Sequence, residues 1–309
     1  MLYREFGALG WQVSSIGMGT WNIGNQWGEL DDTTVWSTIR AAFEKGVNLF
    51  DTAESYGIPN GLSEERLGVA LAGIRHQVYL VSKIGHWGKR TGQGVPKTTV
   101  DMIRLCAHAS LHRLQTDWID VMLCHEGDIE DPSVYLEAFE WLKDRGRIRA
   151  YGISTDSLKV LKRFNANGTC SVVEVNYSLL NRDPEEDILP YCQEQGIAVL
   201  IRGPLHRGLL AGKYSLETEF EDSVRDVWNV GGARREEYER DIALVENLKE
   251  VVDPGQEMVQ AALRFVISHP AAPVAIPGAK SPEQATMNAA AGDRVLTQEE
   301  KQELLAALE

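Results

Sequence analysis

Eight apolar runs of strand length recur along the chain, and amphipathic stretches with helical spacing lie between most of them. The runs are Ile16–Gly19, Val47–Phe50, Val78–Val81, Trp118–Cys124, Ile148–Ile153, Val172–Val175, Ile197–Ile201 and Val274–Ile276. Strands that alternate with helices form parallel β-α units. Eight such units in 309 residues predict an α/β fold, a (β/α)8 TIM barrel that spans residues 1–309 as a single domain.

The expected helices cover 33–45, 97–114, 132–144, 183–195 and 256–268, where apolar residues repeat every three or four positions. A doubly wound parallel sheet is the alternative architecture. That fold usually carries G-x-G-x-x-G after its first strand, and the segment "GMGTWNIG" has a different glycine spacing. The barrel is therefore the favoured fold.

Two segments fall outside the eightfold pattern. The N-terminal "LYREFGALGWQVSS" has hairpin character with Gly10 near its turn, and we expect it to close the bottom of the barrel. Residues 203–255 follow the seventh strand and are too long for a simple link, with a charged helix expected around 234–250. Long insertions after a barrel strand tend to be functional.

The charge and cysteine content restrict the partners and the compartment. A formal net charge of −14 argues against nucleic acid or an anionic membrane as the main partner. The four cysteines are far apart with no C-x-x-C pair, which fits a reducing compartment. The N-terminus lacks a signal-peptide pattern, and no apolar stretch is long enough for a membrane span. We expect a soluble, cytoplasmic protein with a small-molecule partner.

A polar residue follows most of the apolar runs. These residues are Asp51, Lys83, His125, Ser154, Asn176 and Arg202. Taken singly, each has a simple structural interpretation: an aspartate as a helix or turn cap, a histidine as a packed core residue, and a lysine as a solvated charge. In a barrel, however, all six converge on the C-terminal rim, where catalysis occurs. Together they predict an active site.

The stretch "VNLFDTAESYG" adds a phenol to this rim, because Tyr56 follows Asp51 by five residues. A tyrosine has an unperturbed pKa of about 10, and a nearby lysine ammonium favours the phenolate. We therefore expect Lys83 to lower the pKa of Tyr56, Asp51 to hold Lys83, and His125 to donate a hydrogen bond to a substrate oxygen. Such a group protonates a forming alkoxide or removes a proton from an alcohol. This chemistry needs a hydride donor, and the sequence predicts no metal site.

The sequence resembles the aldo-keto reductase family over nearly its whole length. The motifs that carry the resemblance are "NLFDTAESYG", "LVSKIG", "IDVMLCHEGD", "IRAYGIS", "VNYSLL", "GPLHRGLLAGKY" and "IPGAKSPEQATMNAAAG". The resemblance implies an (α/β)8 barrel that uses a nicotinamide cofactor to reduce aldehydes, ketones or sugars, or to run the reverse reaction. It also implies a catalytic tetrad of Asp51, Tyr56, Lys83 and His125.

The resemblance further implies a set of cofactor-binding residues. These are Thr20, Trp21, Asp51, Ser154, Thr155, Asn176, Arg202, Gly203, Pro204, Leu205, Gly208, Lys213, Gly278, Lys280, Gln284 and Asn288. Within this set, the loop from Gly203 to Lys213 is expected to fold over the pyrophosphate. Independently, Ser281, Pro282 and Gln284 read as a capping-box helix start, and a helix N-terminus beside Lys280 attracts phosphate. We therefore predict NADP(H), with NAD(H) as a possible substitute.

Several positions depart from the common family pattern. Thr155 stands in place of Asn, Asn176 in place of Gln, Arg202 in place of a stacking aromatic residue and Gly203 in place of a phosphate-binding serine, while Met287 replaces an acidic contact to adenine. Arg202 could stack as an aromatic ring would, or it could face an anion. These changes affect the cofactor site and leave the tetrad intact.

The substrate pocket is assigned to Trp21 and Trp87, and the segment "HWGKR" is either an anion- or sugar-binding element or an exposed loop. His108 and His112 have a possible metal spacing but no third ligand nearby in sequence, which favours surface or packing roles. A cofactor-binding regulatory or partner subunit with slow turnover stays open as another function. A barrel isomerase or aldolase would need a metal set or an isolated Schiff-base lysine, and the pairing of Asp51 with Tyr56 and the dinucleotide-like segment 276–288 argue against it. The substrate, the direction of the reaction and the oligomeric state are not readable from the sequence.

Overall fold

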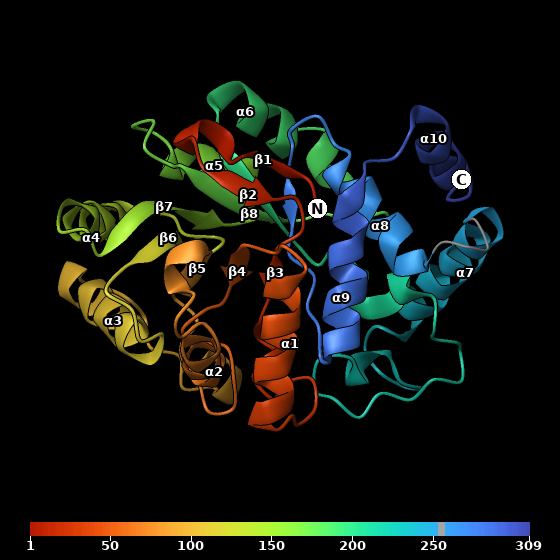
Figure 1. Ribbon diagram of the computed structural model, residues 1–309, viewed down its shortest axis with the longest axis horizontal. Helices are drawn as coiled ribbons and strands as arrows, with labels where there is room; N and C mark the ends of the chain where they lie inside the picture. Colours follow the sequence, from red (N-terminus) through yellow and green to blue (C-terminus); the bar gives the residue numbers. More distant parts are fainter. Residues whose placement is uncertain (253–256) are drawn as a thin grey trace.

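The computed structural model describes residues 1–252 and 257–309, and eight parallel strands form its centre (Figure 1). The strands are β3 Met18–Gly19, β4 Leu49–Asp51, β5 Tyr79–Ile84, β6 Ile119–Cys124, β7 Ile148–Ser154, β8 Val172–Asn176, β9 Ala198–Arg202 and β10 Val274–Ala275. They pair in sequence order from β3 to β10. Two isolated parallel bridges, Ile16 to Ala275 and Gly19 to Gly278, join the first strand region to the last. The predicted (β/α)8 barrel is confirmed.

Helices surround the strands and connect them. They are α1 Asp32–Glu44, α2 Leu62–Ala70, α3 Val100–Arg113, α4 Ser133–Asp144, α5 Leu158–Phe164, α6 Ile188–Gln195, α7 Arg235–Val251, α8 Met258–Ile267, α9 Pro282–Ala290 and α10 Gln298–Ala306. Short 3-10 turns are η1 Gly7–Leu9, η2 Trp21–Ile23, η3 Arg75–Gln77, η4 Lys89–Thr91, η5 Asp183–Glu185, η6 His206–Ala211, η7 Asp226–Trp228 and η8 Ala291–Asp293. None of the helices in the described ranges has the length and apolar character needed to cross a bilayer.

The expected helices are present with shifted boundaries. The helix predicted from 97 begins at Val100, because the Thr99 hydroxyl accepts a hydrogen bond from Met102 N and caps it. The helix predicted over 183–195 divides into η5, which contains Pro184, and α6. The prediction for 256–268 corresponds to α8, although residue 256 lies outside the described residues.

The N-terminal hairpin closes the lower end of the barrel as predicted. Strands β1 Tyr3–Glu5 and β2 Gln12–Ser14 pair antiparallel, and Gly10 adopts φ 69° in the turn between them. Phe6 and Val13 belong to the apolar cluster inside the barrel, together with residues at the first positions of β4, β8, β9 and β10. Because these are the N-terminal ends of parallel strands, the hairpin seals the end opposite the predicted site.

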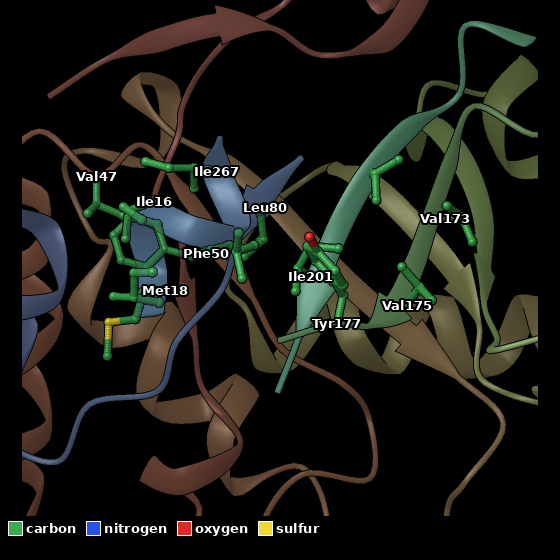
Figure 2. Close-up of a cluster of buried hydrophobic side chains, with 14 of the residues drawn as sticks. Ile16, Met18, Val47, Phe50, Leu80, Val173, Val175, Tyr177, Ile201 and Ile267 are labelled. Atoms are coloured by element: carbon green, nitrogen blue, oxygen red, sulfur yellow. The ribbon is translucent and has the colours of Figure 1, made fainter. Parts of the chain in front are cut away.

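The strands divide the core into an inner and an outer part. Val172 belongs to the inner cluster, while Val173 and Val175 belong to the cluster that packs against the helices, together with Phe50 and Ile201 (Figure 2). This alternation is the two-residue period of a β-strand. A polar residue two positions after an inner apolar residue therefore points into the barrel at its C-terminal end.

The insertion after β9 forms η6, η7 and α7 over residues 203–252. The charged helix expected around 234–250 is α7. The remainder of the predicted insertion, 253–255, lies outside the described residues. Trp228 and Tyr238 are fully buried and stack with ring centroids 5.4 Å apart, so the insertion has an aromatic core of its own.

Candidate active site

The strand alternation delivers charged side chains to the C-terminal end of the barrel. Asp51 follows the inner residue Leu49 by two positions, and Lys83 follows Val81 in the same way. The six polar strand-end residues of the sequence prediction are all at or directly after the C-terminal ends of β4 to β9. The barrel therefore brings them to one rim, as the sequence predicted.

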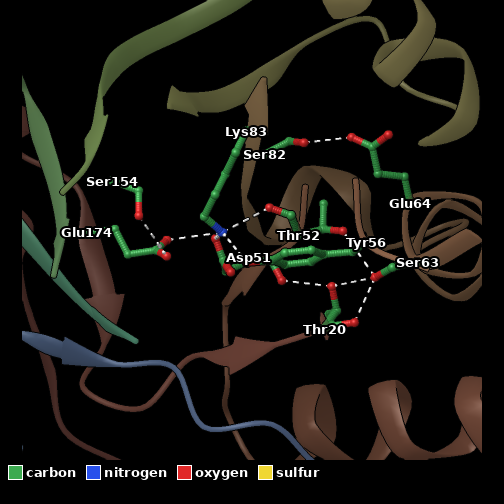
Figure 3. A network of polar contacts seen from close by, with 10 residues as sticks. All are labelled: Thr20, Asp51, Thr52, Tyr56, Ser63, Glu64, Ser82, Lys83, Ser154 and Glu174. Atoms are coloured by element: carbon green, nitrogen blue, oxygen red, sulfur yellow. Dashed lines mark hydrogen bonds and ion pairs between the residues drawn. The ribbon is translucent and has the colours of Figure 1, made fainter. Parts of the chain in front are cut away.

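The Lys83 ammonium is the centre of a buried polar network (Figure 3). Its Nζ donates to Asp51 Oδ1 at 2.5 Å, to the Thr52 carbonyl at 3.1 Å and to the Tyr56 hydroxyl at 3.3 Å. The Lys83 side chain is 0% exposed and the Asp51 side chain 3%. Asp51, Tyr56 and Lys83 therefore form one connected group, which is the arrangement that the predicted tetrad requires.

A second carboxylate, which the sequence interpretation missed, contacts the same ammonium. Glu174 Oε2 lies 3.1 Å from Lys83 Nζ, and the Glu174 side chain is 1% exposed. Its other oxygen accepts a hydrogen bond from the Ser154 hydroxyl at 3.4 Å. The signal was present: Glu174 is a lone charge within the apolar run of β8, two positions after the inner residue Val172. A buried charge of this kind requires a partner.

The pKa of Tyr56 departs from the expectation. Burial raises this pKa, the Lys83 ammonium opposes the rise, and the carboxylates of Asp51 and Glu174 add to it, so that the net pKa is well above its ordinary value. The predicted lowering by Lys83 is therefore present, but the sequence interpretation considered the ammonium alone, and burial with the two carboxylates outweighs it. Tyr56 is therefore a neutral phenol throughout the physiological pH range.

The two charged partners of Tyr56 are also perturbed. Burial raises the pKa of Asp51 strongly and Glu174 adds to the rise, against the effect of Lys83. Burial alone lowers the pKa of Lys83, but the carboxylates of Asp51 and Glu174 outweigh it, and the net pKa is raised. Lys83 is thus a permanent cation between two acids.

His125 follows β6 and is neutral. Burial lowers its pKa well below the ordinary range, and His86 and Lys83 lower it further. Its ring stacks on His86 at a centroid distance of 4.0 Å and meets the Tyr56 ring edge-on at 6.0 Å. Burial, Lys89 and Lys83 lower the pKa of His86 to about 4. The buried Nδ1 of His125 has no hydrogen-bond partner among the described residues.

The two tryptophans assigned to the pocket have different surroundings. Trp21 stacks beside Tyr56 with ring centroids 6.0 Å apart, which places it at the site. Trp87 instead lies 5.2 Å from the guanidinium of Arg113. From the same "HWGKR" segment it is Arg90 that reaches the site, with its guanidinium 5.3 Å from the centroid of the Trp21 ring.

The side-chain hydroxyls of three residues predicted to contact the nicotinamide are hydrogen-bonded to other groups of the protein. The buried Thr20 hydroxyl donates to the Asp51 carbonyl at 2.8 Å. The Thr155 hydroxyl donates to the Gly127 carbonyl at 2.6 Å. Ser154 is bonded to Glu174, as described above. Their direct role toward a cofactor stays a prediction.

Asn176, Arg202 and Gly203 lie together at the ends of β8 and β9. Arg202 pairs with the Asp156 carboxylate, so its guanidinium is engaged by an acid at the rim. Gly203 has φ 65°, and a Cβ at that position would lie 2.6 Å from Asn176 Oδ1. The positive φ is the local reason for glycine at 203, because a serine there would be strained, and Asn176 would also have to move.

The loop expected to cover the pyrophosphate begins with tight turns. Pro204 is buried, and Gly208 has φ 93° and donates its N–H to the Leu205 carbonyl at 2.8 Å. Lys213 is exposed, with its ammonium 5.2 Å from the Tyr214 ring. These positions stay predictions for phosphate contact.

The start of α9 differs in one bond from the predicted capping box. Gln284 N donates to the Ser281 hydroxyl at 3.3 Å, and Pro282 is the first helical residue, as expected. The Gln284 side-chain oxygen Oε1, however, accepts a hydrogen bond from Lys280 N at 2.9 Å rather than from Ser281 N. Farther along the helix, the Asn288 amide donates to the Gly278 carbonyl at 3.1 Å.

Cations gather around this helix start. Lys280 Nζ donates to the Trp27 carbonyl at 2.5 Å, and the Arg225 guanidinium lies 5.3 Å from the Trp27 ring. Burial lowers the pKa of Lys280 and Arg225 lowers it further, Asp222 opposes this, and Lys213 adds a smaller lowering. Mutual repulsion of cations beside a helix N-terminus fits an anion such as a phosphate. Lys280 at this helix start thus fits a dinucleotide phosphate, whereas the nearby Arg225 guanidinium is paired with the Asp222 carboxylate at 2.6 Å.

Possible metal ligands occur elsewhere. His108 meets the Trp141 ring edge-on at 6.5 Å, which is a packing role for one of the two histidines with metal spacing. Within the described ranges, one group of potential ligands lies close together: His206, Glu237 and Asp241. His206 Nε2 lies 3.1 Å from Asp241 Oδ2, and Glu237 forms an ion pair with Arg234. This group joins η6 to α7.

Comparison with known proteins identifies relatives over the full chain. The model of the aldo/keto reductase family matches residues 15–309. Aldo-keto reductase YhdN of Bacillus subtilis is 35% identical over 295 residues, which cover 92% of this chain and 86% of YhdN. The glycerol dehydrogenase AKR11B4 of Gluconobacter oxydans superposes with a TM-score of 0.85 at 30% identity, covering 99% and 94% of the two chains. An aldo-keto reductase of Klebsiella pneumoniae in complex with NADPH superposes with a TM-score of 0.75 at 30% identity, covering 98% and 94%.

Proposed function

This chain belongs to the aldo/keto reductase family of oxidoreductases, and we propose that it interconverts a carbonyl compound and its alcohol with NADP(H), using Tyr56 as the proton donor. The carbonyl is that of an aldehyde, a ketone or a sugar. The observation that carries the proposal is the partly buried hydrogen bond between Lys83 Nζ and the Tyr56 hydroxyl at 3.3 Å, with Asp51 bonded to the same ammonium.

The chain supplies the proton side of this reaction. When bound, the reduced nicotinamide supplies the hydride. Tyr56 is neutral because its pKa is raised, chiefly by burial, so it enters the reaction with its proton in place. As negative charge develops on the substrate oxygen, the phenol transfers that proton, and Lys83 stabilises the phenolate left behind. Asp51 fixes Lys83 in position through the 2.5 Å contact.

His125 contributes orientation rather than charge. Its ring is neutral, since burial and the neighbouring His86 and Lys83 lower its pKa. A neutral imidazole donates one hydrogen bond, and a substrate carbonyl beside Tyr56 is a suitable acceptor. The stacking of His125 on His86 holds the ring plane. This arrangement supports recognition of an uncharged oxygen next to the phenol.

A substrate screen tests the proposal. Purified protein is mixed with NADPH and a panel of aldehydes, ketones and sugars, and with NADP+ and the matching alcohols, while the absorbance of the reduced cofactor is followed. We expect a substrate-dependent change in this absorbance with at least one of these substrate classes. Tight cofactor binding without turnover on any class would favour the regulatory or partner-binding subunit instead.

The cations at the start of α9 predict a preference for NADP(H) over NAD(H). A 2′-phosphate placed there gains a charge-assisted contact with Lys280, which is worth about 1.5–3 kcal/mol, or roughly ten- to a hundredfold in affinity. We expect Lys280→Ala to weaken NADPH binding selectively when both reduced cofactors are titrated by protein fluorescence. Lys45→Ala, at the C-terminal end of α1, is the control. Equal affinities in the wild type, or equal losses in Lys280→Ala, would contradict the assignment.

The rim also predicts a preference for substrates with an anionic group. The Arg90 guanidinium lies over Trp21 beside Tyr56, and burial lowers its pKa against a smaller opposing effect of Tyr56. A carboxylate or phosphate on the substrate would pair with it. We expect Arg90→Ala to raise KM roughly tenfold for a carboxylate-bearing aldehyde and to leave KM for its neutral amide nearly unchanged. An equal effect on both substrates would assign Arg90 to packing.

A further inference from the structure

The most informative group outside the predicted tetrad is the buried Glu174. We propose that Glu174 is a positioning residue that acts through Lys83 and raises the pH at which Tyr56 loses its proton. This inference rests on the proposed proton transfer from Tyr56. It extends the proposal by adding a second acid to the site.

The first argument is the number of acceptors around Lys83. An ammonium has three protons, and four oxygens lie within 3.3 Å of Nζ: Asp51 Oδ1 at 2.5 Å, Thr52 O and Glu174 Oε2 at 3.1 Å, and Tyr56 OH at 3.3 Å. The Tyr56 hydroxyl is the most distant of the four. The hydrogen bonds to Asp51, Thr52 and Tyr56 use the three protons, so Glu174 Oε2, which has no hydrogen bond among the described residues, acts on Lys83 through its charge alone.

The second argument is the balance of charge. Lys83 is one cation between two carboxylates, and all three side chains are at most 3% exposed. Without Glu174, the Lys83 ammonium would face the Asp51 carboxylate alone. It would then stabilise a phenolate at Tyr56 more strongly. With Glu174 present, a phenolate at Tyr56 would be a third anion around a single cation. The geometry therefore favours the protonated phenol.

The charged and titratable groups around Tyr56 come from five elements. They are Asp51 of β4, Lys83 of β5, Arg90 of η4, His125 after β6 and Glu174 of β8. His125 is neutral, so it adds no charge at physiological pH. Arg90 and Lys83 favour the phenolate, and the two carboxylates oppose it. Replacing Glu174 changes this balance without altering any group that touches the Tyr56 hydroxyl.

The test uses Glu174→Gln, which keeps the shape of the side chain and removes its charge. In the reduction direction the rate falls as pH rises through the pKa of Tyr56, because the donor is lost. We expect this alkaline fall in kcat/KM to move to lower pH by about one unit or more in Glu174→Gln. Glu64→Gln is the matched control, since Glu64 is also fully buried but pairs with Arg113 and Ser82 instead of Lys83. The control should leave the position of the alkaline fall unmoved.

A second readout does not depend on turnover. Tyrosinate absorbance is titrated in Glu174→Gln and in the same variant carrying Tyr56→Phe, over the pH range in which circular dichroism shows the wild type folded. The difference between these two titrations isolates the ionisation of Tyr56. The wild type and Tyr56→Phe give the reference difference in the same way. Tyr56 should ionise at a lower pH in Glu174→Gln than in the wild type. An unchanged Tyr56 ionisation in this titration would overturn the role of Glu174. A shifted ionisation in a protein without turnover would instead contradict the proposed function and leave the Glu174 effect intact.

Discussion

Replacing Tyr56 with phenylalanine is expected to lower kcat for carbonyl reduction by about two to four orders of magnitude. The ring would keep its stacking with Trp21, but the hydroxyl that lies 3.3 Å from Lys83 Nζ would be gone. The two neighbouring nitrogen groups do not replace it: Lys83 is a cation held by two carboxylates, and burial lowers the pKa of His125 well below its ordinary value. The measurement is steady-state kcat and KM with the best substrate of the screen.

A matched control separates this effect from general damage. Tyr177 is also buried, and its hydroxyl donates to Glu185 at 2.6 Å, away from Lys83. We expect Tyr177→Phe to retain near-normal turnover and Tyr56→Phe to retain near-normal binding of NADPH, measured by fluorescence. Near-normal turnover in Tyr56→Phe would remove Tyr56 from its role as acid and base.

Replacing Lys83 with methionine is expected to abolish measurable turnover and to destabilise the fold. Methionine has a similar length but leaves Asp51 and Glu174 buried without a cation. Removing one partner of a buried ion pair costs about 3–5 kcal/mol of unfolding free energy. Denaturant unfolding, with comparison of midpoint and slope, measures the loss.

The raised pKa of Asp51 determines how the stability of Lys83→Met changes with pH. Its pKa is raised in the folded protein, chiefly by burial, and without Lys83 the largest opposing influence is absent. The folded variant then binds protons more tightly than the unfolded chain, so its stability falls as pH rises above the unfolded value of about 3.9. We expect the deficit of Lys83→Met to be smaller at mildly acidic pH than at pH 8. A loss of unfolding free energy that does not change with pH would show that Asp51 and Glu174 are not left charged in Lys83→Met.

Lys97→Met provides the control for the loss of a buried lysine. Lys97 is 2% exposed and pairs with Glu54 at 3.4 Å, outside the contacts of Lys83. This variant should be destabilised and still turn over substrate. Loss of turnover in both variants to the same degree would point to unfolding rather than chemistry.

The barrel could be predicted because its strands are apolar and its helices amphipathic. Each β-α unit can therefore be recognised from the spacing of its apolar residues. The short elements were less accessible. α2 begins at Leu62, and its N-cap residue Gly61 has no side chain to cap it, while α5 has only seven residues. α10 was missed although Thr297 and Glu300 form a capping box, a pattern that can be read from sequence.

The candidate site was predicted in outline but not in its electrostatics. Asp51, Lys83 and His125 stand at strand ends, where a change from apolar to polar residues marks them. Glu174 stands inside a strand, so attention to the first polar residue after the run selected Asn176 instead. The sign of the Tyr56 pKa shift depends on burial and on Glu174, and neither is visible in a local motif.

The positions around the cofactor show the same limit. Arg225 approaches Trp27 and Lys280 from a part of the chain more than fifty residues away from Lys280 in sequence, with no motif to mark it. Trp87 was expected at the pocket because it is aromatic and near Lys83, yet it packs against Arg113. Side-chain direction in a rim loop depends on tertiary contacts, which a sequence pattern does not specify.

A single-turnover experiment tests the central claim most directly. Protein loaded with NADPH is mixed with an excess of the best carbonyl substrate, and the decay of the reduced cofactor is followed in the wild type and in Tyr56→Phe. Single-turnover kinetics separate chemistry from binding and product release. We predict a fast decay in the wild type, unchanged up to mildly alkaline pH, and a decay about two or more orders of magnitude slower in Tyr56→Phe. Equal decay rates in the two proteins, with equal NADPH loading, would contradict proton donation by Tyr56.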